Sequence, residues 1–211
     1  MAFPVPITSV LTGATVAQLA YWRKDTRSSP ALLVPENKRS GRYLYSWADV
    51  VALRSIVYLR SEKSLPKIRR AVATLRRLES DQWTHLAGYK LISTPRTILV
   101  RTPSGQLLDV EQHPGTVVTE TLMRDVLAPF ETRTGRTVPA LRQPRPHITV
   151  DPQVLGGYPV LAGTRVPFDA VASLADDDLE PAEISAIYPS AVPEAIADAL
   201  AFAQQVAAVS G

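Results

Sequence analysis

The charged residues of this chain are sorted by sign along its length. Residues 1–80 hold 14 lysines and arginines against 5 acidic residues, and residues 81–150 hold 8 against 6. Residues 151–211 hold one base, Arg165, against 9 acidic residues. The formal net charge of +3 therefore averages a basic end and an acidic end. One domain with scattered surface charge rarely separates its charges in this way, so the sequence predicts two functional modules, one of them suited to a polyanion.

Composition narrows the class of protein. An apolar content of 45% over 211 residues is enough for a buried core. There are no cysteines and only three histidines, none at metal-ligand spacing, so we expect no disulfide, no metal and no cofactor. No apolar run approaches the roughly 18 residues of a membrane span, and no secretion signal or catalytic motif occurs. We therefore expect a cytoplasmic protein that is not an enzyme.

Two short helices are predicted near the N-terminus. Thr8–Gly13 forms a short segment that ends in a glycine, which closes a helix at little steric cost. Thr15 and Gln18 have the spacing of a capping box, which predicts a second helix running to about Lys24. Helical periodicity places Val16, Leu19 and Trp22 on its inner face and Ala17, Gln18, Tyr21 and Lys24 on its outer face. This is the outline of a helix-turn-helix.

A basic hairpin, or wing, is predicted next. Lys38, Arg39 and Arg42 surround the turn at Ser40-Gly41, and Tyr43–Tyr45 favours a short strand. Two further helices begin at Ser46 and Ser64. The stripes predicted to face the core are Val50, Leu53 and Val57 on the first, and Leu65, Ile68, Val72 and Leu75 on the second.

These features together point to DNA. Gln18 is suited to reading adenine edges in the major groove, while Tyr21 and Lys24 can reach phosphates or bases. The wing side chains would supply salt-dependent affinity for the backbone. The alternative is that these are ordinary solvated charges.

The middle of the chain changes character. Residues 96–102 and 106–111 favour a β-hairpin, and residues 120–127 a short helix. Residues 131–147 contain three prolines and four arginines (Arg133, Arg136, Arg142 and Arg145) with almost no periodicity, which predicts a partly extended linker.

The acidic end favours a strand at residues 148–150 and a turn at residues 156–159. Helices are predicted at residues 169–174, 181–187 and 193–206, with Pro181 and Pro193 in first turns. The last helix is expected to pack through Ile196, Leu200 and Ala203. The expected fold is α+β and mainly helical, in four parts. These are a winged helix-turn-helix (residues 1–80), a segment with a small β-hairpin (81–130), the Pro/Arg linker (131–147) and an acidic helical domain (148–211).

The basic end resembles the MerR-type winged helix over roughly residues 7–78. The resemblance is carried by Thr15–Trp22, Gly41–Ser46, Asp49-Val50, Leu53 and Ser64–Arg69. It implies that the second helix enters the major groove while the wing grips phosphate, with Thr15, Ala17, Arg23 and Tyr43 joining the candidate DNA-binding residues. The chain departs from the pattern at Ala20, where the family usually has an arginine before its aromatic pair, and Arg23 is a candidate replacement. The long dimerising coiled coil is also missing, which puts MerR-type effector sensing in doubt.

The acidic end resembles a small prokaryotic domain, the domain-of-unknown-function family numbered four-three-three, found in antitoxins. The resemblance spans about residues 148–207 and is carried by Gly157–Pro167, Tyr188-Pro189 and Glu194–Leu200. The two modules together look like a VapB-type antitoxin. This implies a homeodomain-like three-helix fold, self-association as a dimer or larger assembly, neutralisation of a PIN-domain ribonuclease toxin, and repression of its own operon through operator DNA. The alternative is a MerR-like, ligand-responsive transcription regulator without a toxin partner.

Two sets of residues are candidates for toxin binding. Acidic side chains could cover a basic RNA-binding groove electrostatically, and the candidates are Asp176, Asp177, Asp178, Glu180 and Glu183. The alternative is a solvated helix end, with acids favourably placed at the start of the next helix. An arginine could instead enter an acidic nuclease site, and the candidates are Arg133, Arg136, Arg142, Arg145 and Arg165. For Arg165, internal pairing is the favoured alternative.

Overall fold

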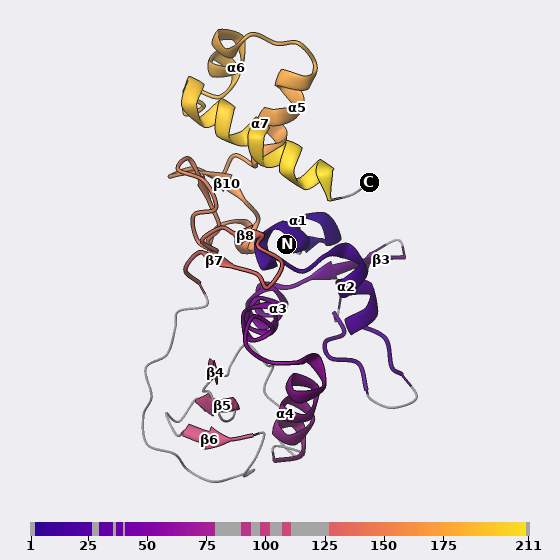
Figure 1. Ribbon diagram of the computed structural model, residues 1–211. Helices are drawn as coiled ribbons and strands as arrows, with labels where there is room; N and C mark the ends of the chain where they lie inside the picture. The colour runs from indigo at the N-terminus through magenta and orange to yellow at the C-terminus, as the bar shows by residue number, and fades with distance from the viewer. Residues whose placement is uncertain are drawn as a thin grey trace.

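The computed structural model describes residues 3–26, 30–35, 37–39, 41–78, 90–93, 98–101, 107–110 and 127–209. Within them the fold is α+β, as expected. The helices are α1 (Val5–Thr12), α2 (Val16–Trp22), α3 (Trp47–Leu59), α4 (Leu65–Leu78), α5 (Phe168–Asp176), α6 (Pro181–Ile187) and α7 (Pro193–Ala208), with a 3-10 turn η2 (Leu155–Gly157). Figure 1 shows α5–α7 at one end of the molecule and α4 at the other, with α1 and α3 between them.

The strands form small antiparallel sheets. They are β1 (Phe3–Pro4), β2 (Asn37–Arg39), β3 (Arg42–Tyr45), β4 (Lys90–Ser93), β5 (Ile98–Arg101), β6 (Leu107–Asp109), β7 (Phe130–Glu131), β8 (Thr137–Val138), β9 (Ile148–Thr149) and β10 (Val160–Leu161). The sheet orders are β1-β3-β2, β4-β5-β6, β7-β8 and β10-β9. The predicted hairpins at Ser40-Gly41 and between residues 96–102 and 106–111 are confirmed by the β2–β3 and β5–β6 pairings. The helix predicted at residues 120–127 lies outside the described residues except for its last position.

Local signals set the helix boundaries near the N-terminus. Gly13 ends α1 with a φ of +79°, and its N–H donates to the Ser9 carbonyl. A Cβ at Gly13 would collide with Val138, so glycine is required there for packing as well as for the backbone. Thr15 and Gln18 form the predicted capping box at the start of α2.

The predicted inner face of α2 is only partly confirmed. Leu19 and Trp22 are each 1% exposed, but Val16 is 37% exposed. Placing Val16 on the inner face was therefore wrong. Val16 is the first residue of a seven-residue helix, and the later residues of the helix make the core contact.

Helix α3 is buried along most of its length and carries a cation into the core. Its predicted stripe of Val50, Leu53 and Val57 is buried, and so is Arg54, which is 0% exposed. The Arg54 guanidinium donates to the carbonyl oxygens of Leu11, Ala128 (2.7 Å) and Pro139 (2.6 Å), and Phe130 lies beneath it at 5.0 Å. A buried guanidinium is tolerated when its N–H groups are satisfied in this way.

Residues 131–147, which the sequence predicts to be a partly extended linker, pack against the rest of the fold. Strands β7 and β8 form a hairpin that contacts α1, and Val138 and Leu141 are buried at 1% and 0% exposure. Of the carbonyl groups that Arg54 binds, that of Pro139 lies in this segment and that of Ala128 lies just before it. Residues 131–147 have no regular hydrophobic periodicity, so their folding depends on contacts with residues distant in sequence.

The helices of the acidic end follow their predicted boundaries closely. Pro181 and Pro193 occupy the first turns of α6 and α7. Helix α7 packs on α5, where the Phe202 and Phe168 rings meet edge to face at 4.8 Å, and α7 also contacts α1. One continuous core therefore runs from α4 through α3 and α1 into α7.

Candidate nucleic-acid interface

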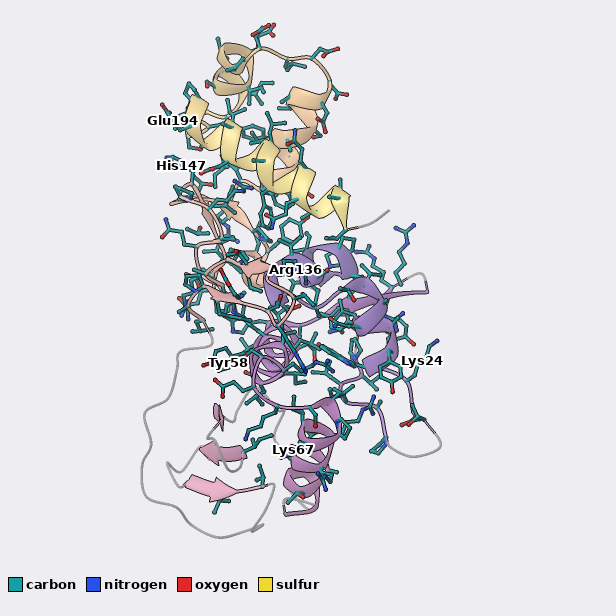
Figure 2. All side chains as sticks on the ribbon, viewed as in Figure 1. Lys24, Tyr58, Lys67, Arg136, His147 and Glu194 are labelled. Atoms are coloured by element: carbon teal, nitrogen blue, oxygen red, sulfur yellow. The ribbon has the colours of Figure 1, made fainter. Side chains whose placement is uncertain are left out.

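The outer face of α2 carries the predicted reading residues. Ala17 and Lys24 are exposed and Tyr21 is 49% exposed, while Gln18 is half-buried. Figure 2 shows Lys24 on the outer side of the molecule beyond α2, with Glu194 at the far, opposite end. The capped helix thus presents a polar face to solvent at the basic end.

The capping box restricts what Gln18 can offer to a base. Its Oε1 accepts the N–H of Thr15 at 2.9 Å, and its own backbone N–H donates to the Thr15 hydroxyl oxygen at 3.1 Å. Bidentate recognition of adenine needs both the oxygen and the amide nitrogen of a glutamine. With the cap closed, Gln18 offers its amide nitrogen alone, and a bidentate contact requires the cap to open.

The β2–β3 hairpin places two arginines beside each other. Arg39 and Arg42 are paired residues on either side of the turn, where Gly41 has a φ of +78°. Both side chains are exposed, and neither forms an ion pair with a carboxylate of the described residues. Lys38 pairs with Tyr43 in the same ladder. The hairpin tip therefore presents positive charge without an internal counter-ion among these residues.

Arg23 lies inside the fold instead of pointing outward. Its side chain is half-buried, and its guanidinium carbon lies 4.3 Å from the centroid of the Tyr43 ring. Burial raises the pKa of Tyr45, and the neighbouring Arg23 guanidinium opposes that shift. Arg23 joins α2 to β3, so in this structure it does not take the outward place of the arginine missing at Ala20.

A residue of α4 that sequence reasoning did not select approaches the same face. The Arg69 guanidinium donates to the Pro30 carbonyl at 2.8 Å and lies 5.2 Å from the Tyr21 ring centroid. Its neighbour Arg70 is exposed. The amphipathic pattern of α4 was the available signal, because it leaves both arginines outside the buried stripe, but that pattern does not reveal the contact with Tyr21.

The acidic candidates divide into two groups. Asp176, Asp177 and Asp178 are exposed at the C-terminal end of α5, where the helix dipole disfavours negative charge. Glu180 and Glu183 begin α6, where the dipole favours it, and the Glu180 N–H donates to the Glu183 carboxylate at 2.9 Å. The alternative that these acids stabilise the start of the next helix therefore accounts for the two glutamates. It does not account for the three aspartates.

The candidate arginines do not lie on one free arm. Arg133 and Arg142 are exposed, with Arg142 5.7 Å from the Trp47 ring, whereas burial lowers the pKa of Arg136. Arg145 lies 4.0 Å from the Asp198 carboxylate on α7 and donates to the Ala201 carbonyl at 3.3 Å. These contacts fix Arg145 in place.

Arg165 is the one arginine candidate of the acidic end. It is exposed on a tight turn closed by the Leu161 N–H and the Val166 carbonyl at 2.9 Å, and no carboxylate of the described residues pairs with it. The expected internal pairing is therefore not seen in this part of the chain.

Comparisons with known proteins agree with part of this picture. Residues 148–203 match the model of a family described as a protein of unknown function (DUF433), which confirms the resemblance of the acidic end. No curated protein matches the chain. An X-ray crystal structure of Rv2018 from Mycobacterium tuberculosis aligns over 95% of this chain and 100% of its own with a TM-score of 0.53 and 13% identity. That likeness concerns the fold alone.

Two kinds of feature are absent from the described ranges. They contain no group of three or more histidine, aspartate or glutamate side chains placed to hold a metal. No helix among them has both the length and the apolar character needed to cross a membrane.

Proposed function

We propose that this chain is a cytoplasmic DNA-binding antitoxin that neutralises a PIN-domain ribonuclease and, as a dimer, represses its own operon. The observation that carries the DNA-binding part is the contact of Arg23, at the end of the capped helix α2, with Tyr43 of the hairpin that carries Arg39 and Arg42. In this proposal the basic end is a winged helix-turn-helix, α2 enters the major groove, and the hairpin contacts phosphate.

In this proposal the candidate residues have different roles. Ala17, Gln18, Tyr21 and Lys24 face outward and form the reading surface, and Arg39 and Arg42 supply affinity independent of sequence. Thr15 fixes Gln18 through the cap, and Arg23 holds Tyr43 and the hairpin against α2. DNA binding of this kind depends strongly on salt.

The acidic end supports the proposed protein partner. A ribonuclease must bind RNA phosphates, so we expect the groove that holds the RNA to carry positive charge, which an acidic domain can cover. Asp176, Asp177 and Asp178 are exposed and lie where the helix dipole disfavours them, so a basic partner would relieve an unfavourable arrangement. Arg165 and the exposed Arg133 and Arg142 remain alternatives for contacting the nuclease. The homeodomain-like fold and self-association of the acidic end are part of the same proposal.

Co-expression with the reading frame adjacent to the gene tests the partner. Affinity capture of the chain should recover a ribonuclease whose activity is suppressed in the complex. The triple variant Asp176→Asn, Asp177→Asn and Asp178→Asn should restore ribonuclease activity, while the control double variant Glu62→Gln and Glu131→Gln should not. Recovery of an active, unbound nuclease would contradict neutralisation. A chain that binds DNA but no nuclease would indicate the regulator without a toxin partner.

A further inference from the structure

A surface groove of about 680 Å³ lies between α2 and α4, next to the proposed DNA-reading face. Tyr21 and Pro30 form one side, and Leu65, Arg69, Arg70 and Ala73 are on the α4 side. The volume falls within the range of small-molecule sites in proteins, roughly 300–1,000 Å³. The proposed function gives a role to Tyr21 but to none of the other residues that line this groove.

The groove is lined by apolar side chains and by two positively charged ones. None of its lining residues is acidic, and two of them are arginines. Arg69 is held in place by its hydrogen bond to the Pro30 carbonyl and its position 5.2 Å from the Tyr21 ring. Arg70 is exposed and forms no ion pair with a carboxylate among the described residues. A ligand that matches the apolar walls and the positive charge of Arg70 needs an apolar body and one anionic group.

We propose that this groove binds a small aromatic carboxylate. Its carboxylate would pair with the Arg70 guanidinium, whose planar fork matches a carboxylate. Its ring would lie against Leu65, Ala73 and the exposed part of Tyr21. An inorganic phosphate is a poorer fit, because it would leave the apolar walls exposed to water.

Occupancy of the groove would compete with DNA. Tyr21 belongs to the groove and to the outer face of α2, so a ligand on its ring occupies a side chain that the DNA needs. By linkage, the ligand must weaken DNA binding by the same factor by which DNA weakens ligand binding. This coupling rests on the proposed function, whereas binding of the carboxylate does not.

Calorimetric titration of the full-length chain with 2-naphthoate tests the site, with the uncharged 2-naphthamide as the matched probe. We expect saturable binding of the carboxylate with a Kd of about 1 mM or tighter. Arg70→Gln should weaken the binding of 2-naphthoate roughly tenfold and leave the affinity for 2-naphthamide unchanged, because only the charged probe pairs with the guanidinium. Ala73→Phe should weaken the binding of both probes by filling the groove, and Arg60→Gln, at an arginine that does not line the groove, should change the binding of neither.

The outcomes separate the site from its coupling to DNA. No saturable binding to the wild-type chain, or binding that Arg70→Gln leaves unchanged, would overturn the inference. Reduced DNA affinity in Arg70→Gln and Ala73→Phe with no binding of either probe would assign the groove to the DNA footprint and also overturn it. Naphthoate binding to a chain with no DNA affinity would support the site and contradict the proposed function. Arg70 is exposed, so we expect Arg70→Gln to fold normally. The site can therefore be tested with Arg70→Gln even if Ala73→Phe misfolds.

Discussion

The guanidinium carbon of Arg23 lies 4.3 Å from the centroid of the Tyr43 ring and joins the end of α2 to strand β3. The contact links the two elements that the proposed function uses, one to read bases and one to grip phosphate. The hairpin turn itself is a short two-residue connection. The orientation of its arginines relative to α2 therefore depends on contacts such as this one.

Separating Arg23 from Tyr43 should loosen the hairpin. In a double-mutant cycle with Arg23→Ala and Tyr43→Leu, we expect a coupling energy of about 0.5–1 kcal/mol in the free energy of unfolding. Amide hydrogen exchange in β2 and β3 should be faster in each single variant. Strictly additive effects on stability would contradict the assigned role of this contact.

The two roles of Gln18 can be separated by substitution. Gln18→Ala removes the amide and the bond from the Thr15 N–H to Oε1, whereas the Thr15 hydroxyl still accepts the N–H of residue 18, so it should lower the free energy of unfolding by about 0.5–1 kcal/mol. Gln18→Glu keeps an oxygen acceptor for the Thr15 N–H, so stability should remain close to that of the wild type. Both variants should lose sequence preference in DNA binding, measured by anisotropy on matched and scrambled sites. Unchanged preference in Gln18→Glu would exclude the amide from base recognition.

Of the substitutions considered, Arg54→Met should lower the free energy of unfolding the most. Arg54→Met leaves the carbonyl groups of Leu11, Ala128 and Pro139 without their donor, which we expect to cost about 3 kcal/mol or more in urea unfolding. Hydrogen exchange should rise across β7 and β8. Arg60→Met, at the end of the same helix, is the control. A loss below about 1 kcal/mol would be typical of a surface site and would contradict the role given to Arg54.

Tyr158 should make stability depend on pH in the alkaline range. Burial raises the pKa of Tyr158 above its ordinary value of 10.0, and the hydrogen bond that it donates to Asp169 (2.6 Å) acts in the same direction. Because the folded pKa is the higher one, this contribution is complete below pH 10 and is lost as the pH rises further. The loss is at most about 1.4 kcal/mol per pH unit, reduced by solvent screening.

The comparison for Tyr158 is Tyr158→Phe, followed by urea unfolding at several pH values. The stability difference between wild type and variant should be constant around neutral pH and shrink above pH 10. A difference independent of pH through that range would contradict the shifted pKa.

The parts of the fold that followed from the sequence are those with local causes. The capping boxes of Thr15–Gln18 and Ser46–Asp49 use residues three positions apart, and the first-turn prolines of α6 and α7 act within one turn. The β2–β3 hairpin follows from its own turn residues. These elements also carry the candidate DNA-binding residues. The predicted outer face of α2 depends on local helical periodicity, and most of it is exposed.

The parts that could not be predicted depend on contacts distant in sequence. Arg54 binds the Pro139 carbonyl across 85 positions, and this contact helps fold a segment whose sequence is typical of a linker. The packing stripe of α7 was predicted as Ile196, Leu200 and Ala203. Ile196 is buried, but Leu200 and Ala203 are only partly buried. The unpredicted Phe202 is fully buried, because its ring meets that of Phe168. The contacts of Arg23, Arg69 and Arg145 likewise need the three-dimensional fold.

The central claim is that α2 and the β2–β3 hairpin bind DNA, and a salt series tests it most directly. Fluorescence anisotropy of the full-length chain on the DNA upstream of its gene should give a linear fall of log affinity with log salt. Replacing Arg39 and Arg42 by glutamine should make the slope shallower by about 0.9 for each phosphate that is no longer neutralised, and it should weaken all sequences alike. No affinity at low salt, or an unchanged slope in the double variant, would contradict the claim.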